Sequence, residues 1–174
     1  MLELGPGPGL TTDLLRQRVN SLTAIEVDRT LAESLGRRLR GSNVRIVVGD
    51  ATEMPFPDEQ FSGVVSFTML HHLSSTALQD RLFAQAWRVL EPGGVFVGSD
   101  SRQSWLMRMV HIGDTLVPIN PDTVSARLQS AGFEVLEIEK SSRAFRFHAR
   151  RPVTTPERSV RLRHSMDQIF ETLN

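Results

Sequence analysis

The sequence predicts an α/β fold in which a parallel sheet is covered by helices. Apolar stretches typical of strands alternate with amphipathic stretches typical of helices along residues 1–100, and this alternation is the pattern of a parallel sheet. Further along, two strand-like stretches, 133–139 and 143–150, are separated by only a few residues. A parallel crossover needs about a dozen residues or more, so this pair predicts an antiparallel hairpin.

The composition is that of one globular domain. The chain has 174 residues, of which 40% are hydrophobic, and a formal net charge of zero, so no overall field draws it to nucleic acid or a membrane. It contains no cysteine, which excludes disulfides, thiolate zinc sites and cysteine nucleophiles. No apolar run approaches the roughly 18 residues that span a bilayer, and no signal peptide is visible. We therefore expect a cytoplasmic protein without a metal site.

The first half of the chain supplies three strands and two helices. A short apolar strand ends at Leu4 and enters a glycine-rich turn. Apolar residues at helical spacing then predict a helix; they are Leu10, Leu14, Leu15 and Val19. The next expected elements are a strand over 22–27, a helix over 29–40, a strand over 43–48 and a loop over 51–60.

The second half continues the alternation. Val64, Val65 and Phe67 belong to the next strand, and a long amphipathic helix covers 75–90. The run Glu91-Pro92-Gly93-Gly94 stops that helix and turns into a strand over 95–97. Asn120-Pro121 is typical of a helix start, and this helix runs to Ala131.

Two segments lie outside this alternation. Residues 101–118, with His111 and Asp114, are apolar but irregular, and two interpretations stay open: a lid over a substrate, or an ordinary amphipathic connection. Residues 152–174 read as a tail helix, separate from the domain at 1–151. Its apolar stripe predicts docking on the domain or on a second copy of the chain as a homodimer; the stripe consists of Leu162, Met166, Ile169, Phe170 and Leu173.

The turn after the first strand reads Gly5-Pro6-Gly7-Pro8-Gly9. A strand, a glycine turn and a helix form the front edge of a nucleotide-type pocket. A dinucleotide fingerprint is GxGxxG, whereas the glycines here alternate, and the two prolines remove N–H donors that a pyrophosphate would need. Glu26, at the end of the next strand, has the spacing of a carboxylate that accepts ribose hydroxyls. The turn therefore predicts a site for a nucleoside without phosphates.

Five features in order give the chain a family resemblance: Glu3-x-Gly5-x-Gly7-x-Gly9, Glu26, Gly49-Asp50-Ala51, FSGVVSFTMLHHL at 61–73, and Leu90-Glu91-Pro92-Gly93-Gly94. Over about residues 1–150 the chain resembles the class I S-adenosylmethionine-dependent methyltransferases, in the small-molecule, methyltransferase type 11-like branch. The resemblance implies a Rossmann-like doubly wound sheet with strands one to five parallel and an antiparallel hairpin of strands six and seven. Relatives generally carry helices before the first strand, so these cover helices are expected to be missing here.

The resemblance also implies roles in binding S-adenosylmethionine. The glycines Gly5, Gly7 and Gly9 let the backbone pass under the methionine part, and Glu3 lies near its amino group. Glu26 takes the ribose hydroxyls. Asp50 accepts from the adenine amine, and Ala51 lies beside it. Ser66 and Phe67 border the sulfonium. Carboxylates suit these hydroxyl and amine donors and a cationic ligand.

The candidates for a catalytic base are His71 and His72, just beyond the fourth strand, at the edge of the sheet where ligands bind. The alternative is that at least one of them caps or packs the following turn. Adjacent side chains on a strand or helix point apart, so we expect no two-histidine metal site.

Three functions remain open from the sequence. The first is methyl transfer from S-adenosylmethionine to an unidentified small-molecule acceptor. The second is a cofactor-binding pseudoenzyme that regulates a partner, and the third, disfavoured by the prolines, is an NAD(P)-dependent oxidoreductase. Base-amine methyltransferases usually carry an Asn/Asp-Pro-Pro-Tyr-like motif where this chain has Ser66-Phe67-Thr68-Met69, which argues against nucleic acid as the acceptor. Residues 140–164 are basic, and both a solvated face and an anionic partner are open interpretations.

Overall fold

The computed structural model describes residues 1–101, 117, 119–142 and 144–153. The segment 102–116, with His111 and Asp114, and the predicted tail helix lie outside the described residues, so the lid, the tail and the domain boundary after residue 151 stay predictions.

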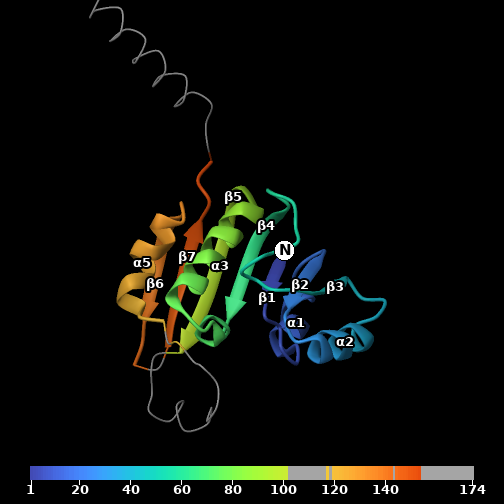
Figure 1. Ribbon diagram of the computed structural model, residues 1–174. Helices are drawn as coiled ribbons and strands as arrows, with labels where there is room; N and C mark the ends of the chain where they lie inside the picture. The colour runs from blue at the N-terminus through green and yellow to red at the C-terminus, as the bar shows by residue number, and fades with distance from the viewer. Residues whose placement is uncertain (102–116, 118, 143, 154–174) are drawn as a thin grey trace, which may run out of the picture.

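One seven-stranded sheet organises the described chain (Figure 1). Its strand order is β3-β2-β1-β4-β5-β7-β6; β1 to β5 pair in parallel, and β7 is antiparallel to both of its neighbours. The predicted parallel sheet with an antiparallel hairpin is therefore confirmed. The strands are β1 Leu2–Leu4, β2 Leu22–Glu26, β3 Val44–Val48, β4 Phe61–Phe67, β5 Leu90–Ser101, β6 Glu134–Lys140 and β7 Ala144–Arg150.

Capping side chains fix where the helices start. Asp28 accepts hydrogen bonds from the backbone N–H groups of the first turn of α2, and Ser75 does the same for α3. Asn120 caps α5, with Pro121 at its first position as predicted. The helices are α1 Leu10–Leu15, α2 Arg29–Arg38, the 3₁₀ turn η1 Leu70–His72, α3 Thr76–Val89 and α5 Pro121–Ser130. None of the helices within the described ranges has the length and hydrophobicity that a membrane crossing requires.

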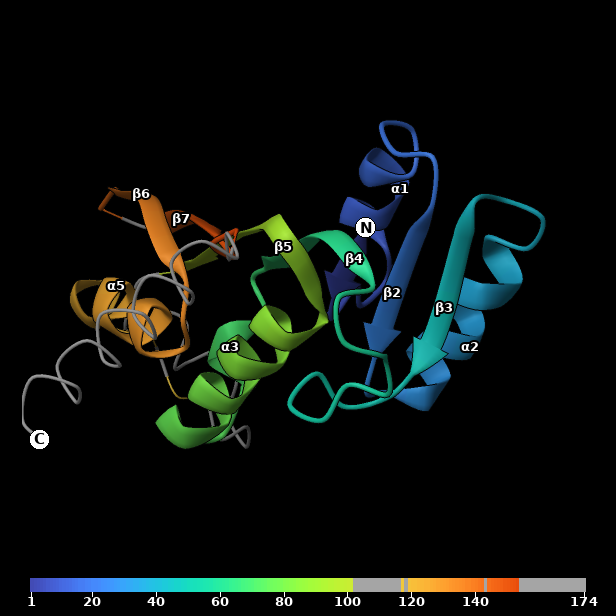
Figure 2. The same cartoon turned by 90° about the horizontal axis from the view of Figure 1, so that it is seen from above.

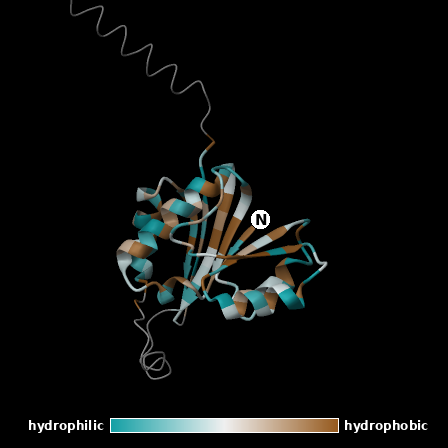
Figure 3. Ribbon diagram, turned by 45° about the vertical axis from the view of Figure 1, so that its right-hand side comes forward, coloured by the Kyte–Doolittle hydropathy of each residue, from teal (hydrophilic) through white to brown (hydrophobic). Residues whose placement is uncertain are grey.

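The hydrophobic core lies between α3, α5 and one face of the sheet (Figure 2). Its centre is a group of fully buried phenylalanines in which Phe96 contacts Phe147 edge-on at 4.9 Å between ring centroids, and Phe83 packs against both. Figure 3 shows the most hydrophobic residues along the strands and more polar residues on the helices. Burial of this face explains why β1, β4 and β5 hold their positions in the sheet.

The opposite face of the sheet is covered by α1 and α2 over β1 to β3. Thr12 of α1 contacts Glu3 of β1, and Gly36 of α2 lies against Ile46 of β3. Over β5 and β7 the side chains on this face, such as Val97 and Arg146, stay partly or fully exposed within the described chain. The cover of this face is therefore uneven.

Helix α1 is present but differs in detail from its sequence pattern, and the expected start of one strand is wrong. The helix after the glycine turn is shorter than its apolar stripe, and that stripe does not face the core, since Leu10 and Leu14 are 78% and 57% exposed while Thr12 is fully buried. The strand expected over 95–97 begins at Leu90, because the Glu91–Gly94 run forms an irregularity inside β5 where the register with β4 shifts.

Candidate functional site

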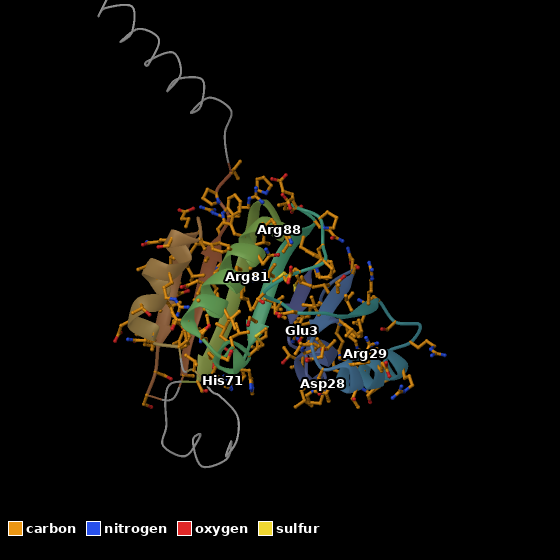
Figure 4. The ribbon with its side chains drawn as sticks, in the orientation of Figure 1. Glu3, Asp28, Arg29, His71, Arg81 and Arg88 are labelled. Carbon is orange, nitrogen blue, oxygen red and sulfur yellow. The ribbon has the colours of Figure 1, made fainter. Side chains whose placement is uncertain are left out.

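The predicted site residues meet at one edge of the sheet. The strand order reverses at β1, whose neighbours are β2 on one side and β4 on the other, and in open α/β sheets ligands bind at such a switch point, beside the carboxyl ends of the strands. The glycine turn follows β1, Asp28 follows β2, and His71 follows β4. Figure 4 shows Asp28 and His71 at this lower end of the sheet and Arg88 at the opposite end.

The glycine turn adopts a backbone that glycine alone takes easily. Gly5, Gly7 and Gly9 have φ of 63°, 53° and 88°, in the left-handed region. Their N–H groups all donate within the protein: Gly5 to the Ile25 carbonyl, Gly7 to the Glu26 carboxylate and Gly9 to the Pro6 carbonyl, each at 2.9 Å. Pro6 and Pro8 have no N–H. No N–H of these five described residues is left to bind a phosphate.

The three glycines differ in the space around them. A Cβ at Gly5 would lie 2.5 Å from Cγ of Met69, and one at Gly9 would lie 2.4 Å from a methyl group of Leu35. A Cβ at Gly7 would meet no atom of the described residues within 4 Å. Gly5 and Gly9 are thus required by packing, whereas Gly7 is the member of the turn with open space beside it.

Glu26 is oriented toward the glycine turn, as the sequence predicts for a ligand-binding carboxylate. The side chain is 7% exposed; one oxygen accepts from the Gly7 N–H at 2.9 Å and the other accepts from the Asp28 N–H at 3.0 Å. A carboxylate oxygen can accept more than one hydrogen bond, so Glu26 retains acceptor capacity next to the open space at Gly7.

Glu3 lies beneath the same turn as a buried acid. It is 2% exposed and accepts a hydrogen bond of 2.7 Å from the hydroxyl of Thr12. Burial raises the pKa of Glu3 above its ordinary value, and the Thr12 hydrogen bond opposes only part of that rise. A cation near Glu3 would favour its charged form.

Asp50 and Ala51 occupy different surroundings. Asp50 is exposed and uses one carboxylate oxygen to accept from the Thr52 N–H at 2.7 Å. The neighbouring Gly49 N–H donates to the Glu26 carbonyl at 2.9 Å, so Asp50 begins the loop immediately beside the end of β2. Ala51 is 5% exposed and belongs to the core cluster, so its methyl group contributes to the core.

Ser66 and Phe67 end β4 on opposite faces of the sheet. Ser66 pairs with Leu4 and Gly98 and therefore shares the core face; it is fully buried, and its hydroxyl has no hydrogen-bond partner among the described residues. Phe67 is partly exposed and, by strand alternation, shares the face of Glu3. The side chain of Phe67, and only the backbone of Ser66, has the direction expected for the site.

The two histidines lie together, which differs from the expectation that they point apart. Because η1 is a tight 3₁₀ turn, the rings of His71 and His72 are 4.2 Å apart between centroids and inclined by 36°. His71 is 4% exposed, and its Nδ1 lies 2.6 Å from Oδ1 of Asp100 at the end of β5, while His72 is exposed. No cluster of three or more metal-ligating side chains occurs in the part of the chain that the structure describes.

Three residues at this edge of the sheet are absent from the sequence prediction. Thr12 binds Glu3, Met69 covers Gly5, and Asp100 binds His71. Only Asp100 has a clear signal, since it is an acid three residues after the predicted strand 95–97, toward the carboxyl edge of the predicted sheet. The other two contacts depend on tertiary packing.

Comparison with known proteins agrees with the fold. Residues 2–98 match the family described as "Methyltransferase domain". This chain belongs to that family, within the class I S-adenosylmethionine-dependent methyltransferases, as the resemblance implied.

Two curated relatives illustrate the range of the family. The chain is 29% identical over 143 residues to a probable S-adenosylmethionine-dependent methyltransferase of Mycolicibacterium smegmatis, covering 78% of this chain and 52% of that protein. It is 44% identical over 66 residues to a probable ribosomal RNA small subunit methyltransferase A of Thermococcus onnurineus, covering 38% of this chain and 24% of that protein. The chain thus spans about half of one relative and about a quarter of the other.

Solved structures share the fold at low sequence identity. A S-adenosylmethionine-dependent methyltransferase of Methanosarcina mazei matches with a TM-score of 0.72 at 19% identity, covering 87% of this chain and 92% of that chain. The [4+2]-cyclase SpnF also matches with a TM-score of 0.72 at 19% identity, covering 87% and 74%. These likenesses concern the fold, and function has to be argued from the site.

Proposed function

We propose that this chain transfers a methyl group from S-adenosylmethionine to a small-molecule acceptor. The observation that carries the proposal is the closed set of hydrogen bonds in the glycine turn. Because the N–H groups of Gly5, Gly7 and Gly9 all donate internally, the turn offers nothing to the pyrophosphate of a nicotinamide cofactor. It instead presents a carboxylate and open space, which suit a nucleoside without phosphates.

The residues at this edge have the chemistry that such a ligand needs. Glu26 would accept the ribose hydroxyls beside Gly7, and the free oxygen of Asp50 would accept from the adenine amine. Glu3, whose pKa is raised by burial, would gain a charged partner in the ligand's ammonium group. Phe67 would border the sulfonium. These donors and acceptors are complementary to the ligand, so the site fits it.

When bound, S-adenosylmethionine supplies a methyl group on positively charged sulfur, which leaves as a neutral thioether. The protein's task is then chiefly alignment, which can contribute about 7–11 kcal/mol to lowering a barrier. The turn and Glu26 would fix the nucleoside end, and Phe67 and η1 would border the place where the acceptor approaches. His71 and His72 are the residues of η1 that could take a proton from the acceptor.

Calorimetry on the chain with S-adenosylhomocysteine and with NAD tests the cofactor assignment. We expect the first ligand to bind and the second not to bind at the same concentrations. Asp50→Asn should weaken S-adenosylhomocysteine binding about 10- to 100-fold, because an amide NH₂ would then face the adenine amine and a hydrogen bond to a charged group would be lost. The control is Glu53→Gln in the same exposed loop, which should bind as the unmodified chain does. Binding of NAD alone would overturn the proposal.

RNA is the second candidate acceptor. It is favoured by the 44% identity over 66 residues to a probable ribosomal RNA methyltransferase, although that match covers 24% of the relative and the residues after β4 are not the base-amine motif. A transfer assay with labelled methyl groups, run in parallel on small acceptors and on ribosomal RNA, separates the two. Label in the RNA alone would replace the small-molecule assignment.

If the chain binds S-adenosylhomocysteine but transfers a methyl group to neither acceptor class, the result would support the alternative hypothesis of a cofactor-binding pseudoenzyme that regulates a partner. The cytoplasmic location and the homodimer through the tail helix also stay predictions from the sequence.

A further inference from the structure

Asp100 binds the imidazole of His71 at the end of β5. Its Oδ1 lies 2.6 Å from Nδ1 of His71, and its Oδ2 accepts from the backbone N–H of the same residue at 3.1 Å. The backbone N–H of Ser101 also donates to Oδ1 at 2.7 Å. Asp100 is 2% exposed and His71 is 4% exposed, so a carboxylate and an imidazole are held together in a buried place.

This arrangement selects one tautomer of His71. An ionised carboxylate only accepts hydrogen bonds, so the proton of a neutral His71 belongs on Nδ1 and the lone pair on Nε2. A carboxylate on Nδ1–H is the arrangement that orients a histidine base in hydrolytic triads and stabilises the imidazolium formed during reaction. The pair therefore has the form of a base and its orienting acid.

The pair lies beside the proposed cofactor site. Met69, two residues before His71, packs directly on Gly5, which brings η1 against the glycine turn. The backbone at Thr68 has a φ of 56°, which is uncommon for a β-branched residue, and this kink starts the turn into η1. Among the described residues, the ring of His72 also lies against His71, at 4.2 Å between centroids.

We propose that His71 is the general base of the reaction, that Asp100 is its positioning residue, and that the acceptor is therefore a hydroxyl compound, such as a phenol, that enters the site with its proton attached. This inference rests on the proposed function. The acceptor oxygen would form a bond to the methyl carbon while the carbon–sulfur bond breaks and its electron pair stays on sulfur. The hydroxyl proton would move to Nε2 of His71, and Asp100 would balance the charge of the imidazolium.

The first test concerns the tautomer and needs no activity. Long-range ¹H–¹⁵N NMR on the chain should show the His71 proton on Nδ1. In Asp100→Asn the amide NH₂ can donate to Nδ1 and move the proton to Nε2. Asp58→Asn should leave the His71 signal unchanged, because Asp58 pairs with Arg88 at the opposite end of the sheet from His71. A His71 with its proton on Nε2 in the unmodified chain would overturn the inference whatever the fate of the proposed function.

The second test uses a series of substituted phenols of falling acidity as probes. Asp100→Asn should lower kcat about 100-fold or more for a weakly acidic phenol, the range of general base catalysis, and should change little for a phenol that is already ionised. S-adenosylhomocysteine binding should persist in the variant. An equal loss for every phenol, or methylation of thiols and of no phenol by the unmodified chain, would overturn the inference. Absence of S-adenosylhomocysteine binding would instead count against the proposed function.

Discussion

The open space at Gly7 allows the effect of a methyl group on folding to be separated from its effect on binding. Gly7→Ala places an L-residue at a φ of 53°, and in the described part of the chain no atom lies within 4 Å of the new Cβ. The folded chain then bears the cost of a left-handed backbone, about 1–2 kcal/mol, partly offset by reduced freedom of the unfolded chain. The net loss should be about 1 kcal/mol, or a fall of about 2–4 °C in Tm for a chain of this size.

Gly41 provides a matched control outside the glycine turn. It joins α2 to β3, has a φ of 81°, and a Cβ there would also meet nothing within 4 Å. Gly41→Ala should therefore lower the free energy of unfolding by about the same 1 kcal/mol. The two variants then differ in one respect, which is that the methyl group at Gly7 occupies the space beside Glu26.

Calorimetry and urea unfolding together decide the outcome. Gly7→Ala should bind S-adenosylhomocysteine at least about tenfold more weakly than the unmodified chain, which corresponds to about 1.4 kcal/mol, while Gly41→Ala should bind normally. If both variants are equally destabilised and both bind normally, the ligand does not pass over Gly7. The assignment of the glycine turn as the cradle of the cofactor would then be refuted.

Three further predictions concern stability, measured by urea unfolding. Burial raises the pKa of Glu3 above its ordinary value of 4.5. The stabilisation of the fold by protonated Glu3 is therefore fully present below pH 4.5 and is lost as the pH rises through the raised pKa. Glu3→Gln should abolish this pH dependence of the free energy of unfolding, stabilise the chain at pH 7 and weaken S-adenosylhomocysteine binding. Arg151 is 8% exposed and donates to three backbone carbonyls, so Arg151→Met should cost about 3 kcal/mol, against less than about 0.5 kcal/mol for the exposed Arg146→Met. A Cβ at Gly98 would lie 2.4 Å from the ring of Phe147, so Gly98→Ala should cost about 1–3 kcal/mol through overpacking.

The succession of strands and helices along the chain was within reach of the sequence because it depends on local signals. Alternating periodicity places β1 to β5 and their helices, and the short connection between β6 and β7 leaves only a hairpin. The start of β5 was not predictable in this way. Glu91-Pro92-Gly93-Gly94 has the composition of a turn, and Gly93 does adopt a φ of 84°, yet β5 pairs with β4 on both sides of this run.

Helix α1 shows where periodicity fails. A stripe of leucines predicts a buried face, but periodicity does not say whether a neighbouring surface exists to cover that face. In the structure the hydroxyl of Thr12 satisfies the buried carboxylate of Glu3, and this contact turns Leu10 and Leu14 toward solvent. A buried acid that needs a hydrogen bond thus decides the orientation of a helix of six residues.

Part of the site was also beyond the sequence. Glu26 could be placed because its position at the end of a strand fixes its neighbourhood, whereas Asp100 is 29 residues from His71 and meets it only through the pairing of β4 with β5. That pairing puts Phe67 beside Ser99 and so brings the residues after each strand together. Contacts of this kind follow from the register of neighbouring strands, which the sequence does not state directly.

The hydrogen-bond partners of the backbone N–H groups in and beside the glycine turn decide which substitutions can test function. Glu26 holds the Gly7 N–H and the Asp28 N–H, so replacing it would disturb the turn and the start of α2 together. A loss of binding in a Glu26 variant would therefore not distinguish a missing ligand contact from a displaced turn. Gly7 donates its N–H whether or not it carries a methyl group, and its side-chain position is open. Binding measured at Gly7 against Gly41 is consequently the test that isolates the ligand from the fold.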